Sequence, residues 1–145
     1  MLVHDVSWFW HVRDFFGLKT FTPFEEVLIK ELSDRLSGYN RLALESQVKR
    51  FNYCPRLLKA DPSVVGLYGY TNFYLGKNKT DYLPFKMDEP LDVIASAVVV
   101  FNEGEIKVSY TQFKKRLFTL KYTGNKKSYY PPKGKYKFSE FKVFL

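Results

Sequence analysis

A chain of 145 residues, 46% of them apolar, is long enough for one well-filled hydrophobic core and too short for two ordinary domains. An aromatic content of 19% and a charged content of 26% exclude an intrinsically disordered chain, and the single cysteine, Cys54, excludes an internal disulfide framework and a Cys-x-x-Cys metal site. We therefore expect one domain over residues 1–145, with Cys54 as a small buried side chain.

The first part of the chain, about residues 1–56, is predicted to be helical. Apolar side chains at helical spacing between Trp8 and Phe16 predict a short helix that ends at Gly17. A later helix is predicted to begin at Asn40, as an N-cap, and to end near Tyr53, because the following Pro55 forbids its continuation.

The best-defined element is a long helix over about residues 22–37. Thr22 and Glu25 have the spacing of a capping box, and Pro23 occupies the first helical position, where its missing N–H costs nothing. Apolar residues then recur every three or four positions until Gly38, which predicts that one face of this helix is buried: Phe24, Val27, Leu28, Leu32 and Leu36.

The second part, about residues 62–145, is predicted to form strands. Residues 64–70 and 82–86 are expected to be the first two strands, and the almost continuous apolar run of residues 91–101 indicates a central strand. A turn at residues 102–104 leads into residues 105–111, where Ile106, Val108 and Tyr110 alternate with polar residues. Residues 116–122 repeat the alternation with Phe118, Leu120 and Tyr122, and residues 136–144 form the last predicted strand.

Helices followed by consecutive strands favour an α+β fold, because a parallel sheet would need helices between its strands. We expect the N-terminal helices to pack on a four- to six-stranded, mainly antiparallel sheet. No apolar run approaches the roughly 20 residues that cross a bilayer, and the N-terminal residues lack the pattern of a secretory signal. A cytoplasmic location without membrane association is therefore the expectation.

The net charge is strongly asymmetric. Residues 113–145 hold ten of the 23 basic residues and one of the 15 acids, so this segment carries a net charge of +9. Residues 1–112 sum to −1, which gives the whole chain its net charge of +8. Nine aromatic residues are interleaved with these charges. A basic region of this kind attracts an anionic partner and accelerates association with it, without specifying which partner that is.

The leading interpretation is a non-catalytic binding protein that uses this basic C-terminal face to contact an acidic protein. Its most plausible subtype is a small inhibitor or immunity-type protein that neutralises a toxin or an enzyme. The predicted partner-binding residues are the basic and aromatic side chains of the last third that alternation leaves outside the core: Lys114, Lys115, Arg116, Lys126, Lys127, Tyr129, Tyr130, Lys133, Lys135 and Lys137.

Two other functions stay open. The same lysines could neutralise phosphates while Tyr129 and Tyr130 stack on bases, which predicts non-specific binding of RNA or single-stranded DNA, because lysine lacks the planar fork that reads base edges. An enzyme without a recognisable motif is the third possibility. A metal site needs three or four convergent ligands, and the separation of His4 and His11 is the only helpful spacing. Cys54 is followed by Pro55 and has no glycine-rich oxyanion element nearby, so no catalytic residue, metal ligand or cofactor is assigned.

Overall fold

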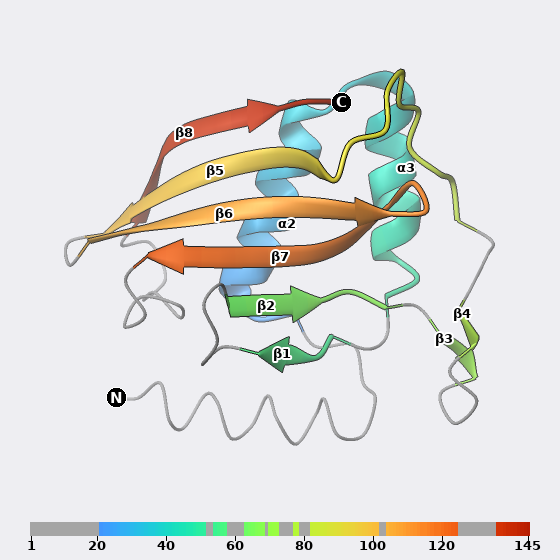
Figure 1. The fold of residues 1–145 in the computed structure, drawn as a ribbon, viewed down its shortest axis with the longest axis horizontal. Helices are drawn as coiled ribbons and strands as arrows, with labels where there is room; N and C mark the ends of the chain where they lie inside the picture. Colours follow the sequence, from blue (N-terminus) through green and yellow to red (C-terminus); the bar gives the residue numbers. More distant parts are fainter. Residues whose placement is uncertain are drawn as a thin grey trace.

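The computed structural model describes residues 21–51, 54–57, 63–68, 70–72, 77–78, 82–101, 104–124 and 136–145. Two helices lie against one face of a six-stranded sheet whose strand order is β1-β2-β7-β6-β5-β8, and β3 and β4 form a separate pair (Figure 1). All pairs are antiparallel. The elements are α2 (Pro23–Arg35), α3 (Gly38–Val48), β1 (Arg56–Leu57), β2 (Ser63–Gly66), β3 (Tyr70–Asn72), β4 (Lys77–Asn78), β5 (Val93–Phe101), β6 (Gly104–Phe113), β7 (Arg116–Gly124) and β8 (Tyr136–Val143).

This architecture confirms the predicted α+β class, with helices that precede a mainly antiparallel sheet. The helix predicted between Trp8 and Phe16 lies outside the described residues.

Helix α2 forms where it was predicted, and for the predicted reason. The Thr22 hydroxyl accepts a hydrogen bond from the backbone N–H of Glu25, and the Glu25 carboxylate accepts one from the N–H of Thr22. This capping box satisfies two N–H groups that no helical turn can reach. The buried face carries Phe24, Leu28 and Leu32, so the predicted spacing of apolar residues is the spacing that the core uses.

Helix α3 corrects one prediction. It begins at Gly38 and ends at Val48, so Asn40 lies inside its first turn and is not the N-cap. The Asn40 side-chain amide binds another segment instead: its Nδ2 donates to the Lys86 carbonyl at 3.2 Å, and its Oδ1 accepts from the Lys86 N–H at 2.8 Å. A short polar side chain that could have capped the helix therefore fixes a loop from a distant part of the sequence.

The strand predicted at residues 82–86 is also wrong, because this segment is a loop. Helix α3 satisfies its backbone groups in place of a neighbouring strand. The Ser46 hydroxyl accepts from the Leu83 N–H at 3.2 Å, and the Gln47 amide donates to the Leu83 carbonyl at 2.8 Å. Pro84, which has no N–H, could not have continued a ladder of hydrogen bonds here.

The hairpin of β5 and β6 confirms the clearest strand prediction. Ile106, Val108 and Tyr110 are buried against the helices, while Lys107 on the other face is exposed. The Tyr110 hydroxyl donates to the Leu28 carbonyl of α2 at 2.8 Å, which joins the two layers, and burial raises the pKa of this phenol. The core therefore lies between α2, α3 and the central strands.

Strand β7 has the predicted position but one side chain differs from the predicted alternation. Leu120 and Tyr122 are buried in the core, as expected. The register shifts between Thr111 and Gln112, whose partners are Thr119 and Leu117, so Phe118 is the extra residue of a β-bulge. A bulge re-aims its side chain. The Phe118 ring accordingly lies beside Tyr68 and Phe113 and not beside Leu120.

Two glycines provide a test of this backbone geometry. Gly124 ends β7 with a φ of +123°, and a Cβ there would lie 2.5 Å from the Glu105 carbonyl oxygen, whereas Gly38 has a φ of +54° and open space. Gly38→Ala should cost about 1 kcal/mol of stability through the backbone alone. Gly124→Ala adds a clash with backbone and should cost more, about 2–3 kcal/mol. Urea unfolding of both variants measures the difference, and equal losses would contradict the predicted close approach.

Candidate binding surface

The face of the sheet turned away from α2 and α3 is built from the outward positions of four strands. Cross-strand pairing places Lys142, Ser96, Ser109 and Lys121 in one row across β8, β5, β6 and β7. The next row towards the β5–β6 turn is Glu140, Val98, Lys107 and Thr123, and the third is Lys137, Val100 and Glu105. We call these eleven residues the lysine face.

The lysine face is rich in short side chains. Serine, threonine and valine occupy the positions between the lysines, and Val100 retains 38% of its side-chain exposure. Neighbouring lysines on adjacent strands repel one another unless an anion lies between them. The surface therefore combines short uncharged side chains with interspersed positive charges.

Four lysines and two glutamates give this face a positive balance. One lysine is neutralised locally, because Lys142 Nζ lies 2.8 Å from the Glu140 carboxylate. The hydrogen bond from Lys142 lowers the pKa of Glu140, and the charge of Lys107 lowers it further. Within the described parts of the chain, Lys107, Lys121 and Lys137 have no carboxylate within ion-pair distance.

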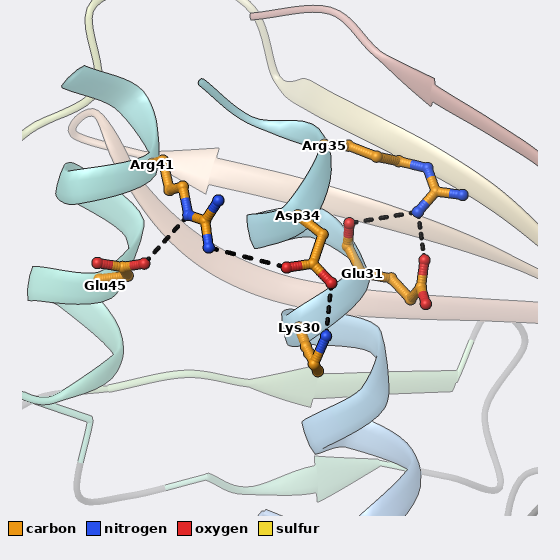
Figure 2. A network of polar contacts seen from close by, with 6 residues as sticks. All are labelled: Lys30, Glu31, Asp34, Arg35, Arg41 and Glu45. Carbon is orange, nitrogen blue, oxygen red and sulfur yellow. Dashed lines mark hydrogen bonds and ion pairs between the residues drawn. The ribbon is translucent and has the colours of Figure 1, made fainter. Parts of the chain in front are cut away.

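The helical layer has the opposite organisation, which Figure 2 shows. Lys30 contacts Asp34 at 2.6 Å, Arg41 lies between Asp34 at 3.9 Å and Glu45 at 3.3 Å, and Arg35 pairs with Glu31. Such exposed pairs add little stability. They do cancel the charges of Lys30, Arg35 and Arg41, whereas three of the four lysines of the lysine face have no carboxylate partner among the described residues.

The structure brings together only some of the predicted partner-binding residues. Lys114 and Lys115 form the two-residue turn between β6 and β7, and Lys137 lies on the lysine face. The remaining predicted lysines and tyrosines lie outside the described residues, and their role stays a prediction: Lys126, Lys127, Tyr129, Tyr130, Lys133 and Lys135.

Arg116 is not a surface cation. Its side chain is buried, and Nη1 donates to the Leu67 carbonyl at 2.7 Å, which ties the start of β7 to the segment that follows β2. The guanidinium lies over the rings of Phe118, at 5.4 Å, and Tyr68, at 5.9 Å. These contacts hold Arg116 within the fold, where it cannot meet a partner directly.

Sequence reasoning did not select three lysines of this face: Lys107, Lys121 and Lys142. All three occupy outward positions in alternating strands, and that alternation was the available signal. Lys107 was missed because it lies outside the basic C-terminal third, although pairing with β7 and β8 brings it into the same surface. The positive face is therefore a property of the strand pairing, not of one segment.

A buried ion pair lies away from this face. Arg56 Nη2 lies 2.6 Å from the Glu25 carboxylate, and both side chains are almost fully buried. Burial raises the pKa of Glu25, while the charge and hydrogen bonds of Arg56 oppose that shift. Glu25 also completes the capping box, so its contacts connect α2 with β1 and serve the fold.

The described residues define an α+β protein with helices on one face of an antiparallel sheet and a basic surface on the other. Within them, no group of histidine, cysteine or acidic side chains could hold a metal ion, and no helix is long and apolar enough to cross a membrane. Cys54 is fully buried. No protein-family model, no curated protein and no solved structure matches this chain.

Proposed function

We propose that this protein is a non-catalytic binding protein that holds an acidic surface of a protein partner against its lysine face. The observation that carries the proposal is a contrast between the two layers. Lys30, Arg35 and Arg41 of the helices are paired with carboxylates. Lys107, Lys121 and Lys137 of the lysine face have no such partner among the described residues. Complementary carboxylates on a partner would accelerate association and orient the complex.

The composition of the face favours a protein over a nucleic acid. Binding of single strands without sequence preference relies on aromatic rings along the strand path. Tyr110, Tyr122 and Phe141 face the helical layer instead, where the rings of Tyr110 and Phe141 lie 5.6 Å apart. Serines, threonines and valines between lysines suit close contact with a protein surface.

The subtype that we propose is a cytoplasmic inhibitor that neutralises a toxin or an enzyme. A basic face with small side chains can cover an acidic region next to an active site, and it requires no chemistry of its own. This subtype predicts a stoichiometric complex in which the partner loses activity.

The decisive test removes the charges from one layer at a time. Lys107→Gln/Lys121→Gln/Lys137→Gln lowers the net charge from +8 to +5 on the lysine face, and Lys30→Gln/Arg41→Gln/Lys49→Gln makes the same change on the helical side. The partner is recovered with immobilised protein from an extract of the source cells, purified, and titrated with each variant by calorimetry. We expect the first variant to bind at least about tenfold more weakly, and the second to bind as the unmodified protein does.

Two outcomes would contradict the proposal. Equal weakening by both triple variants would show that only net charge matters. Recovery of nucleic-acid complexes alone, together with binding of mixed-sequence oligonucleotides at low salt, would support the alternative of a non-specific RNA- or single-stranded-DNA-binding protein.

A further inference from the structure

The turn between β6 and β7 consists of two lysines in a backbone conformation that lysine rarely adopts. Lys114 has a φ of 51° and Lys115 a φ of 61°. Two-residue hairpin turns of this kind favour Asn-Gly, because left-handed backbone angles bring the Cβ of other residues close to a carbonyl oxygen. The chain therefore carries two unfavourable residues at a position where a better pair exists.

Hydrogen bonds from two other segments, helix α3 and the loop that contains Tyr82 and Phe85, hold this turn. The Lys115 carbonyl accepts from the Phe85 N–H at 2.7 Å and from the Gln47 amide at 3.4 Å, and the Lys114 carbonyl accepts from the Tyr82 hydroxyl at 3.4 Å. All of these bonds use backbone carbonyls, so an Asn-Gly turn could keep them. Among the described residues, the two ammonium groups form no hydrogen bond, although the backbone that presents them is fixed.

An exposed aromatic ring lies directly beside the two lysines. Phe113 is 51% exposed, although large apolar side chains are usually buried. Its ring rests on Phe118 at 5.4 Å, and Phe118 lies against Tyr68 and under the guanidinium of Arg116. The Phe113 ring is therefore held in place by its contact with Phe118, and Lys114 Nζ lies 5.5 Å from the centre of the Phe113 ring.

On the basis of the proposed function, we infer that the turn of Phe113, Lys114 and Lys115 is the anchor of the partner contact, and that it binds an acidic segment carrying an apolar side chain. Aromatic residues beside cations are typical of the few positions that carry most of the binding energy of an interface. A turn already fixed by Gln47, Tyr82 and Phe85 has little freedom to lose when a partner binds. The strain at the two lysines is then explained by what their side chains contact in the complex.

A nucleic acid fits this turn less well. Sequence-tolerant binding of single strands needs successive rings on which successive bases stack. Here Phe113 is exposed, but the next ring, Phe118, is half-buried between Phe113, Tyr68 and Arg116. One exposed ring with two ammonium groups matches one apolar side chain flanked by carboxylates.

The test replaces the turn by the sequence that its backbone prefers. Lys114→Asn/Lys115→Gly should raise the melting temperature by about 3 °C, because it relieves the strain, and should weaken binding of the purified partner at least about tenfold. Phe113→Ser keeps both charges and should weaken binding to a similar extent. The Lys49→Gln variant is the control for loss of an exposed lysine elsewhere. A gain in stability together with a loss of affinity cannot result from unfolding.

Defined probes identify the ligand chemistry independently of the partner. A short fluorescent peptide with one tryptophan among glutamates should bind more tightly than the same peptide without tryptophan, and oligo-dT should bind most weakly of the three. Unchanged affinity of the Asn-Gly variant would overturn the anchor, while the lysine-face variants would still decide the proposed function. Tighter binding of oligo-dT that depends on Phe113 would overturn the acidic segment as ligand.

Discussion

Arg56→Met should lower the free energy of unfolding by about 3–5 kcal/mol at neutral pH, because it leaves the Glu25 carboxylate buried without its counter-charge. The side chains of both residues are almost fully buried, and Arg56 holds both carboxylate oxygens at distances of 2.6–3.3 Å. Methionine fills a similar volume but donates no hydrogen bond to Glu25 or to the Cys54 carbonyl. A loss of this size is a large fraction of the stability of an ordinary domain.

The pH dependence of this variant has a definite sign. Burial raises the pKa of Glu25 above its ordinary value of 4.5, and removal of Arg56 takes away the main influence that opposes this shift. An acid whose pKa is higher in the folded state stabilises the fold most when it is protonated. Relative to the unmodified protein, Arg56→Met should therefore lose most stability at neutral pH and recover part of it as the pH falls towards 4.5.

A double variant separates the unpaired charge from lost packing. Glu25→Gln/Arg56→Met keeps a side chain able to form the capping box and removes both charges, so it should recover most of the stability that Arg56→Met loses. Denaturant unfolding at two pH values measures all three proteins. Equal losses in the single and double variants, without pH dependence, would show that Arg56 acts through packing alone.

The local signals in this sequence predicted the elements whose partners are near in the chain. The capping box of Thr22 and Glu25 has its donors and acceptors three residues apart, and the hairpin of β5 and β6 pairs neighbours across a short turn. Period-two alternation also identified Ile106, Val108 and Tyr110 as core residues. These patterns depend on local geometry, so the amino-acid order alone carries them.

The predictions that failed depend on contacts distant in sequence. Asparagine is a common helix N-cap, so the sequence suggested that role for Asn40. Only the position of Lys86 in the fold shows why the Asn40 amide hydrogen-bonds to that backbone instead. Arg116 was placed on the surface because it lies in a basic run, yet the carbonyl of Leu67 and two aromatic rings bury it. The bulge at Phe118 depends on the register between β6 and β7, which alternation within one strand does not specify.

Contacts between distant parts of the sequence also explain why some residues of the candidate site were not predicted. The lysines of residues 113–145 stand out as a segment, whereas Lys107 joins them only because β6 lies between β5 and β7. The strain at Lys114 and Lys115 is likewise invisible without backbone angles. Sequence composition identified a basic segment, and strand pairing places three of its lysines, Lys121, Lys137 and Lys142, on one face together with Lys107.

Gln47→Met should lower the free energy of unfolding by about 2–4 kcal/mol and loosen the β6–β7 turn. Gln47 is buried, and its Oε1 accepts from the N–H of fully buried Leu117 at 2.8 Å, while its Nε2 donates to the carbonyls of Leu83 and Lys115. Methionine matches its length and keeps the packing of α3. The variant leaves the Leu117 N–H without an acceptor in the core, which costs more than an average hydrogen bond contributes.

Ser46→Ala is the matched control, because it removes a neighbouring bond from α3 to an exposed part of the same loop. Water can accept the hydrogen bond of the exposed Leu83 N–H in place of the Ser46 hydroxyl. We therefore expect the free energy of unfolding to fall by less than about 1 kcal/mol. Hydrogen exchange adds a readout specific to position: the Leu117 amide should exchange much faster in Gln47→Met and at the normal rate in Ser46→Ala. If the anchor depends on a rigid turn, Gln47→Met should also weaken partner binding although every side chain of Phe113, Lys114 and Lys115 is intact. Normal binding by a variant with fast exchange at Leu117 would instead show that the lysines act through charge alone, without help from a preformed turn.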